Sequence, residues 1–319
     1  MKILITGIHG FVGSNLVAAL KENHTIYGVD IASPIKEGVS YTFSWDDLDA
    51  GQVPAVDAII HLAGKEHDTK NQAAAEVYFK VNTGLTQKIY DYFLQSTARK
   101  FIFFSTAKAA ADRVDGVLTE DVVPLPVGPY GESKIKAEEY ILAHTPDTST
   151  SSASGTSKSV YILRPCMIHG PGNKGNLNLL YSVVSKGIPW PLGAFENRRT
   201  FTSIDNLSFV ISGLLTKDVP SGIYNMGDDE ALSTNELIEV ICESLGKKAH
   251  IWKLPKGLMN GVAKIGGLLH LPLDPERLRK LTENYISSNA KIKAALGVEQ
   301  MPVDARTGLQ KTLESFKKK

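Results

Sequence analysis

Residues 2–13 read KILITGIHGFVG, a short apolar run followed by three glycines at every third position. Lys2–Thr6 has the length and composition of a buried strand, and a helical pattern runs from Phe11 to Lys21. A strand, a glycine-rich turn and a helix in this order place the N–H groups of a helix N-terminus where a pyrophosphate can bind. The sequence therefore predicts a dinucleotide site built on Gly7, Gly10, Phe11, Val12 and Gly13.

An acidic residue follows the second strand-like run. Asp30 comes directly after residues 25–29, seventeen positions beyond Gly13. A carboxylate there can accept hydrogen bonds from the adenosine ribose and repels a 2′-phosphate. The next four residues, IASP, carry no charge, so the sequence favours NAD over NADP as the cofactor. Asp47 and Leu48, after the next strand-like run, are further candidates that would flank the adenine.

The first half of the chain alternates apolar runs with helical patterns, which is typical of βαβ units and a parallel sheet. Further strands are expected at residues 58–62, 101–104 and 160–163, and helices at 72–95 and from Pro129 to Leu142. Beyond about Cys166 the alternation fades. We predict an α/β Rossmann fold: a doubly wound parallel sheet in an NAD-binding domain over residues 1–165, and a smaller, mainly substrate-binding C-terminal domain over residues 166–319. A segment near 200–226 is expected to return to the first domain.

Two local patterns are also informative. Residues 145–159 contain ten Ser or Thr in fifteen positions and no apolar periodicity, which predicts a solvent-exposed loop. The run Ser233-Thr-Asn-Glu236 fits a capping box that opens a helix.

Composition narrows the class of protein. The 319 residues are 43% hydrophobic and 22% charged, and 35 basic against 34 acidic side chains leave a net charge of +1, so nucleic acid and membrane partners are not expected. Two cysteines cannot form a disulfide framework, and the eight histidines lack ligand spacing, so we expect a reducing compartment and no metal. The first residues run directly into the glycine turn without a signal-peptide pattern, and no apolar run reaches about 20 residues. We therefore expect a cytoplasmic protein.

One tyrosine stands in a catalytic context. Of eleven tyrosines only Tyr130 has a lysine four residues later, Lys134, and this spacing puts both side chains on one helix face. A reactive phenol at neutral pH needs its pKa lowered by about three units, or about 4 kcal/mol. An ammonium group ~4 Å away supplies roughly that amount. Thr106, after the strand at 101–104, adds a hydroxyl that can bind a substrate alcohol or carbonyl oxygen.

With these motifs the sequence resembles the extended short-chain dehydrogenase/reductases, and within them the nucleotide-sugar epimerases. The resemblance covers nearly the whole chain. It includes TGIHGFVG at 6–13, HLAG at 61–64, VNTGL at 81–85, Ser105-Thr106, PYGESK at 129–134, LRP at 163–165, HGPG at 169–172, RTF at 199–201 and SNAKIKAALG at 288–297. More narrowly, STAK at 105–108 and GNL at 175–177 are similar to a bacterial subgroup of UDP-sugar 4-epimerases and UDP-4-keto-sugar reductases.

The resemblance implies a role for each matching residue. Thr106, Tyr130 and Lys134 match the catalytic trio, and Lys134 would also hold the nicotinamide ribose. The cofactor would further be lined by Leu62, Ala63, Gly64 and Asn82. Asn176 and Arg199 would hold the nucleotide and its diphosphate, and Lys108 and His67 are candidate contacts to the sugar. Met167 and His169 depart from the family pattern, and His169 is either a pocket donor or a hydrogen-bonded structural histidine.

Three functions are open at this point. The first is an NAD-dependent 4-epimerase of a UDP-hexose or UDP-N-acetylhexosamine that works through a transient 4-keto intermediate. The second is an NAD(P)H-dependent reductase of a UDP-4-keto-6-deoxy sugar, and the third is a non-catalytic NAD-sensing regulator. Ala107 and Lys108 stand where related dehydratases need a carboxyl pair, which disfavours dehydration. The resemblance also implies a homodimer, paired through the helices at 72–95 and 129–142.

Overall fold

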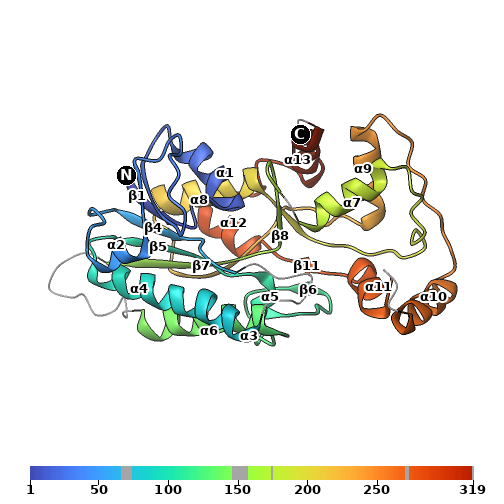
Figure 1. The fold of residues 1–319 in the computed structure, drawn as a ribbon, viewed down its shortest axis with the longest axis horizontal. Helices are drawn as coiled ribbons and strands as arrows, with labels where there is room; N and C mark the ends of the chain where they lie inside the picture. Colours follow the sequence, from blue (N-terminus) through green and yellow to red (C-terminus); the bar gives the residue numbers. More distant parts are fainter. Residues whose placement is uncertain (66–73, 146–156, 174, 270–272, 318–319) are drawn as a thin grey trace.

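The computed structural model describes residues 1–65, 74–145, 157–173, 175–269 and 273–317 (Figure 1). Its centre is a seven-stranded, wholly parallel sheet in the order β10-β7-β5-β4-β1-β2-β3. The strands are β1 (Lys2–Thr6), β2 (Thr25–Val29), β3 (Tyr41–Phe43), β4 (Ala58–His61), β5 (Lys100–Phe104), β7 (Ser159–Pro165) and β10 (Gly222–Met226). The strand order reverses between β1 and β4, and ligands of such sheets bind at the carboxyl ends of the strands beside this point. The predicted doubly wound fold is confirmed.

The central strands β1, β4 and β5 are mostly apolar and are buried after their first residue, because helices cover both faces of the sheet. On one face lie α1 (Phe11–Leu20), α8 (Ile204–Thr216) and α12 (Ala290–Leu296), which share a core with β1. On the other face lie α4 (Leu85–Gln95) and α6 (Pro129–His144), seen side by side below the sheet in Figure 1. The homodimer expected through α4 and α6 stays a prediction.

The helix predicted over 72–95 has a different internal structure. It is described from residue 74 onward and consists of α3 (Ala75–Tyr78), a π-helical turn η1 (Phe79–Gly84) and α4. A π turn adds a residue to the helical turn and so shifts the side chains that follow. Within this turn Asn82 is fully buried. Before it, in α3, the apolar Val77 that belongs to the predicted core stripe is exposed.

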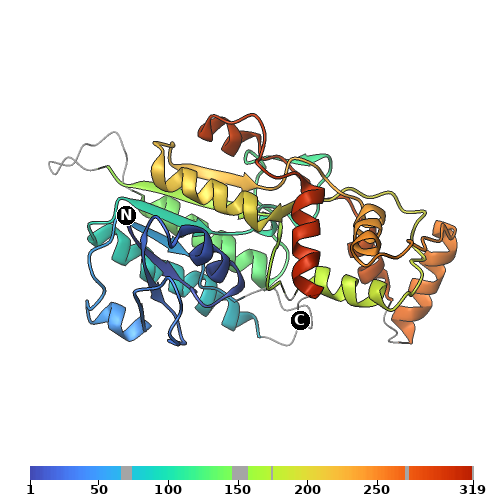
Figure 2. The same ribbon diagram turned by 90° about the horizontal axis from the view of Figure 1, so that it is seen from above.

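The second half of the chain builds a smaller lobe beyond the carboxyl ends of the strands (Figure 2). One small core joins α7 (Asn176–Ser185), α9 (Thr234–Ser244) and α13 (Ala305–Lys317), and another joins α10 (Lys256–Leu268) to α11 (Pro275–Thr282). The capping box predicted at Ser233 and Glu236 opens α9 and is confirmed. Within the described ranges, no helix is long and apolar enough to cross a bilayer.

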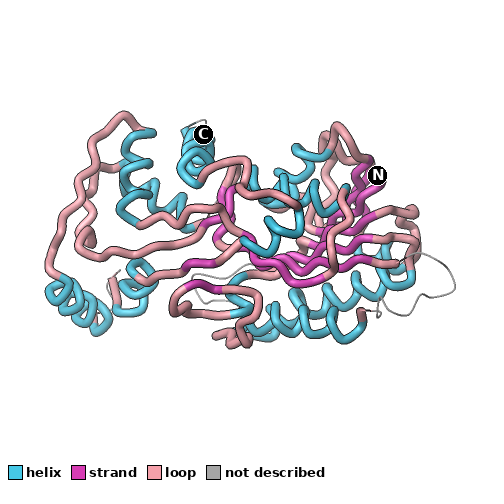
Figure 3. The backbone as a smooth tube through the Cα atoms, turned by 180° about the vertical axis from the view of Figure 1, so that it is seen from behind, coloured by secondary structure: helices cyan, strands magenta, loops and turns pink. Residues whose placement is uncertain are grey.

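The chain crosses between the two parts several times, as the tube in Figure 3 shows. After β8 (Met167–His169), α7 and β9 (Phe201–Ser203), it returns to the sheet as α8 and β10, and β10 pairs with β7. After α11 it pairs as β11 (Ile286–Ser287) with β6 (Val117–Leu118) and returns again as α12. The domain boundary at residue 165 stays a prediction. Residues after it also belong to the sheet domain, because Ile292 and Leu296 of α12 lie in the core with β1.

Candidate active site

The glycine turn after β1 packs directly against the chain that leaves β4. Gly7 has φ of +70°, and a Cβ atom there would lie 2.8 Å from the Ala63 nitrogen. A Cβ on Gly13 would lie 2.5 Å from the Gly7 carbonyl oxygen. Side chains at these positions would therefore push α1 away from the sheet. The turn is closed by hydrogen bonds from the Gly7 N–H to the Val29 carbonyl (2.9 Å) and from the Gly10 N–H to the Gly7 carbonyl (3.0 Å).

The N-terminus of α1 suits an anion. Gly10 is the N-cap residue and supplies no side-chain cap, and the first turn contains no acidic residue. The N–H groups of a first helical turn have no intrahelical partner, so here they can bind a phosphate. The glycine cradle and this helix end therefore fit the pyrophosphate of a dinucleotide, and Gly7, Gly10, Phe11, Val12 and Gly13 are the residues that would hold it.

Asp30 lies beside this turn. One of its oxygens accepts the His9 N–H at 3.0 Å and the other accepts the Ile31 N–H at 2.7 Å. These bonds hold the carboxylate at the carboxyl end of β2, where the predicted ribose contact is needed. Asp47 and Leu48 have other contacts: Asp47 forms a capping box with Ser44 at the start of α2 (Trp45–Asp49), and Leu48 is buried in the core. Their role beside the adenine stays a prediction.

The structure adds a lysine that sequence reasoning missed. No basic residue is next to Asp30 in the sequence, but one is near it in space. The loop after β2 brings Lys36 back over the glycine turn. Its Nζ donates to the Ser14 hydroxyl at 2.6 Å and to the Ile8 carbonyl at 3.1 Å. Burial lowers the pKa of Lys36, and nearby Asp30 opposes this effect. A cation that points at the turn is placed to contact a phosphate of the dinucleotide.

We expect Lys36→Met to weaken NAD binding by about tenfold, the loss typical of one charge-assisted hydrogen bond. Titration calorimetry of NAD into the protein measures this change. Lys21→Met is a matched control, because Lys21 is held at 2.5 Å by Glu37 of the same loop. Unchanged affinity in the Lys36 variant would remove this residue from the cofactor site.

Thr106 and Tyr130 lie at the starts of two helices that pack closely together. Thr106 follows β5 as the N-cap of α5 (Ala107–Ala110), and its hydroxyl accepts the Lys108 N–H at 3.3 Å. Tyr130 is the second residue of α6. Between the helices, a Cβ atom on Gly131 would lie 2.7 Å from the Lys108 carbonyl oxygen, so only glycine permits this approach. The Tyr130 ring also makes an edge contact with Tyr78, with centroids 6.4 Å apart.

Lys134 reaches from α6 to the carboxyl ends of β4 and β5. Its Nζ donates to the Phe104 carbonyl at 2.8 Å and lies 5.0 Å from the centre of the Phe103 ring. A Cβ atom on Gly64 would lie 3.2 Å from the same Nζ, so the amine is beside the loop predicted to line the cofactor. Burial lowers the pKa of Lys134 to about 8, and the nearby Glu138 carboxylate opposes this shift. At neutral pH the side chain is thus still a cation.

Asn82 ties the cofactor-side loop to the helix that carries Tyr130. Its Oδ1 accepts the Lys65 N–H at 2.7 Å, and its Nδ2 donates to the Ser133 hydroxyl at 3.0 Å. The Ser133 hydroxyl in turn donates to the Tyr130 carbonyl at 2.9 Å. Asn82 lies within the π turn, and such turns are frequent at functional sites. Asn82 therefore fixes the start of α6, which carries Tyr130, relative to the loop at Lys65.

A buried ion pair lies under Lys134 and was also missed from the sequence. Glu138 is fully buried and accepts hydrogen bonds from Arg164 of β7, with 2.6 Å between Arg164 Nη2 and Glu138 Oε2. The Ser105 hydroxyl, next to Thr106, donates to the other oxygen. The signal was present, because a glutamate four residues after Lys134 shares its helix face. The pair joins α6, β5 and β7 below the predicted catalytic residues.

On the side of the small lobe, Tyr285 contacts two of the predicted substrate residues. Lys108 Nζ is 4.7 Å from the Tyr285 ring centre and 3.1 Å from Asp112 Oδ1. Arg199 pairs with Tyr285 through the backbone, and its guanidinium donates to the Lys280 carbonyl at 2.7 Å. Both residues thus contact Tyr285, Lys108 through its side chain and Arg199 through its backbone. Their substrate roles stay predictions.

Asn176 and His169, the other described candidates, lie away from Tyr285. Asn176 is exposed at the start of α7, and His67 lies outside the described residues. His169 is buried, with Nδ1 at 2.9 Å from the Thr312 hydroxyl and Nε2 at 3.6 Å from Asp228 Oδ2. Of the two readings left open for His169, the structure favours the hydrogen-bonded structural histidine.

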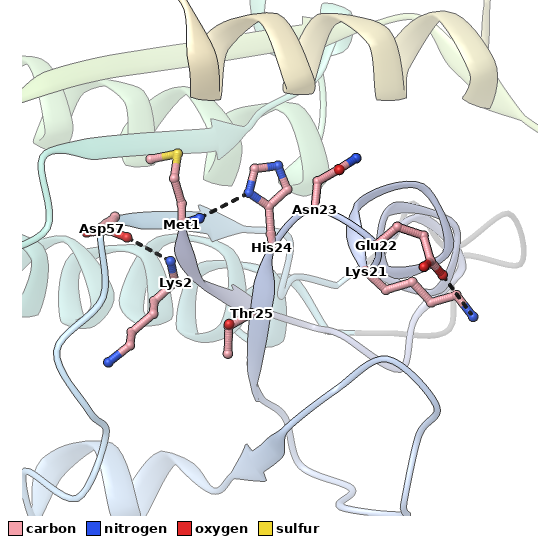
Figure 4. A pocket seen from close by; sticks show the side chains of 8 residues that line it. All are labelled: Met1, Lys2, Lys21, Glu22, Asn23, His24, Thr25 and Asp57. Atoms are coloured by element: carbon pink, nitrogen blue, oxygen red, sulfur yellow. Dashed lines mark hydrogen bonds and ion pairs between the residues drawn. The ribbon is translucent and has the colours of Figure 1, made fainter.

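A hollow of about 450 Å³ lies at the opposite end of the sheet (Figure 4). It is lined by the amino ends of β1 and β2, where Asp57 accepts the Lys2 N–H at 2.7 Å and Met1 lies beside His24. Ligands of doubly wound sheets bind at the carboxyl ends of the strands, and the glycine turn, Thr106 and Lys134 are at that end. This hollow is therefore not the candidate active site.

A doubly wound sheet with a glycine turn after β1, and with a Tyr-x-x-x-Lys pair on the helix beside β5, defines the short-chain dehydrogenase/reductase class of Rossmann proteins. Comparison with known families agrees, since the NAD dependent epimerase/dehydratase family matches residues 3–227. The chain belongs to this family.

Individual relatives narrow the comparison. UDP-glucose 4-epimerase of Vibrio cholerae is 30% identical over 270 residues, which is 79% of this chain and 78% of that protein. Among solved structures, UDP-N-acetylglucosamine 4-epimerase from Bacillus cereus shares the fold with a TM-score of 0.77 at 21% identity, over 99% of each chain. UDP-glucuronic acid 4-epimerase from Bacillus cereus, solved in complex with NAD, gives a TM-score of 0.74 at 22% identity, over 100% of this chain and 99% of the other.

Proposed function

We propose that the protein is an NAD-dependent 4-epimerase of a UDP-hexose or UDP-N-acetylhexosamine. The observation that supports the proposal is the close packing of the helix starts that carry Thr106 and Tyr130, beside the carboxyl end of β5. At this end of β5 the Lys134 amine donates to the Phe104 carbonyl and lies beside Gly64. The relationship to Vibrio cholerae UDP-glucose 4-epimerase supports the same chemistry. Ala107 and Lys108 follow Thr106, so a carboxyl pair for dehydration is missing from those two positions.

In this mechanism NAD, when bound, accepts a hydride from the sugar and returns it. The residues of the chain transfer the proton and position the sugar. The Tyr130 oxygen takes the proton from the C4 hydroxyl while the Thr106 hydroxyl holds the same sugar oxygen. The Lys134 ammonium, kept charged at neutral pH, stabilises the tyrosine in its ionised form.

Epimerisation also requires the 4-keto sugar to rotate in the site, so that the hydride returns to the opposite face of C4 and the proton returns to the oxygen. The sugar must stay bound through its diphosphate during this turn. Arg199 and Lys108, which both contact Tyr285, are two cations in this region that could hold the diphosphate. An arginine fork suits a diphosphate.

The test uses freshly purified protein without added cofactor. UDP-glucose, UDP-galactose and their N-acetyl forms are supplied one at a time, and products are separated by chromatography while the 340 nm absorbance is followed. Interconversion of C4 epimers with no net change in absorbance supports the proposal. Activity only on a 4-keto sugar, with stoichiometric NADH oxidation, would show a reductase instead. Tight NAD binding without turnover of any nucleotide sugar would favour a sensing role.

The pH dependence should report the buried lysine. Because burial lowers the pKa of Lys134 to about 8, its charge is present below that pH and is lost as the pH rises through it. We therefore expect kcat/KM to fall above about pH 8, since the ionised tyrosine then loses its stabilising cation. A rate profile from about pH 6 to 10 measures this. Lys134→Arg, which stays charged over the whole range, should lack the falling limb, and the same limb in that variant would contradict the assignment.

A further inference from the structure

One stretch of the small lobe combines positive charge with a complete lack of acidic residues. Residues 245–273 contain five lysines and no Asp or Glu, while Glu243 and Asp274 stand just outside. The expectation of no membrane partner rests on the net charge of +1 for the whole chain, and that overall value hides this local excess. The lysines are Lys247, Lys248, Lys253, Lys256 and Lys264, and all five are exposed.

Helix α10, in the middle of this stretch, carries an apolar stripe that faces solvent. Leu258, Val262, Ile265 and Leu269 recur at a spacing of four, three and four residues, which places them on one side of a helix. They are 44% to 61% exposed. The helix packs against its own lobe through a different side, where Met259, Ala263 and Gly266 are buried. The stripe is therefore surplus to the packing of the lobe.

Further exposed apolar side chains and lysines lie next to the stripe. Leu268 is 80% exposed beside it, and Trp252, four residues before the helix begins, is 55% exposed. Lys253 follows this tryptophan, and Lys256 and Lys264 lie on the remaining, polar side of α10. Figures 1 and 2 place α10 at the end of the molecule farthest from the β1–β3 edge of the sheet. An apolar stripe, a flanking tryptophan and lysines at one end of a molecule can meet a flat surface without obstruction by the larger part.

We propose that α10 docks this protein on the surface of a bilayer that contains anionic phospholipids. Helices that lie in the membrane interface have an apolar face for the acyl boundary, lysines for anionic headgroups, and tryptophan at the level of the headgroups. A second copy of the chain fits this surface less well, because a symmetric contact would bring two acid-free, lysine-rich segments together. The association is peripheral and does not depend on the proposed function.

The test is sedimentation of the full-length protein with sucrose-loaded vesicles. Vesicles of phosphatidylcholine alone are compared with vesicles that contain about 40% phosphatidylglycerol, each at about 0.1 M and 0.5 M NaCl. The proposal expects binding to the anionic vesicles at low salt and clear weakening at high salt. Absence of binding to the anionic vesicles at low salt would overturn it.

Two variant pairs separate the apolar and the charged contributions. Ile265→Ser with Leu269→Ser should lower the partition coefficient about 10- to 100-fold, because two apolar side chains no longer enter the interface. Lys253→Gln with Lys264→Gln should lower it roughly 25-fold on anionic vesicles, about fivefold for each charge. The matched controls are Val123→Ser, an 83% exposed apolar residue outside this lobe, and Lys80→Gln, an exposed lysine of η1. Both should bind as the wild type does.

Folding and self-association are measured on the same samples. All the substituted side chains are exposed, so unchanged thermal unfolding and NAD affinity are expected. Equal vesicle binding by the Ile265/Leu269 variant and the wild type would overturn the proposal. So would light scattering that shows a wild-type dimer converted to monomer by these two substitutions, since the stripe would then be covered by a second copy.

Discussion

Replacing Tyr130 with phenylalanine is expected to lower kcat by about a thousandfold. Loss of a positioned general acid–base group typically costs 10²–10⁴ in rate, and here the phenol oxygen is the only atom removed. The Tyr130 ring keeps its edge contact with Tyr78, so folding should be nearly unchanged. Initial rates of C4 epimer interconversion, together with thermal unfolding of the same samples, measure both effects.

Tyr140→Phe is the matched control for this experiment. Tyr140 lies on the same helix, and its hydroxyl donates to Asp91 at 2.7 Å, away from Thr106. This variant should retain its rate and lose at most about 1 kcal/mol of stability. A Tyr130→Phe enzyme that turns over like the wild type would exclude the phenol from the chemistry.

The largest expected effect on stability is that of Glu138→Gln. Glu138 and Arg164 are both buried, and removal of one partner of a buried ion pair leaves an uncompensated charge. We expect the free energy of unfolding to fall by about 3–5 kcal/mol, measured by urea denaturation. The adjacent Glu139 is exposed, so Glu139→Gln should change the free energy by less than about 0.5 kcal/mol.

A double variant separates the structural from the catalytic role of this pair. Glu138→Leu with Arg164→Met removes both charges, and such apolar replacements often restore stability. The Glu138 carboxylate also opposes the burial effect on Lys134, so its loss should lower the pKa of that amine further. We expect the double variant to fold, with kcat/KM that falls at a lower pH than in the wild type. An unchanged profile would limit Glu138 to a structural role.

The fold was predictable because its signals are local. β1 and β2 have the predicted bounds, and the glycine turn stands between β1 and α1 as expected. A strand in a parallel sheet is buried on both faces, so it can be recognised as a short apolar run without knowledge of which strands lie beside it. The π turn was not predictable from spacing, because the exposed Val77 continues the apolar pattern as well as a buried residue would.

The candidate site residues that belong to sequence motifs were predicted. Those that reach the site only through contacts between distant parts of the chain were missed. Tyr130 and Lys134 are one helical turn apart, so their shared face follows from the sequence alone. Lys36 approaches Ser14 only through the loop after β2, and Glu138 meets Arg164 only because α6 packs across β7. The surface of α10 was missed for a third reason, since net charge averages a basic segment with the rest of the chain.

The late return of β10 and α12 to the sheet has a consequence for synthesis. β10 pairs with β7, and Ile292 and Leu296 fill the layer under β1. A nascent chain stopped at residue 165 would therefore expose apolar surface on the ribosome. We expect the sheet domain to complete its core only after α12 has been synthesised. We expect such a truncated product to need chaperones or to aggregate, even though it contains every glycine of the nucleotide turn.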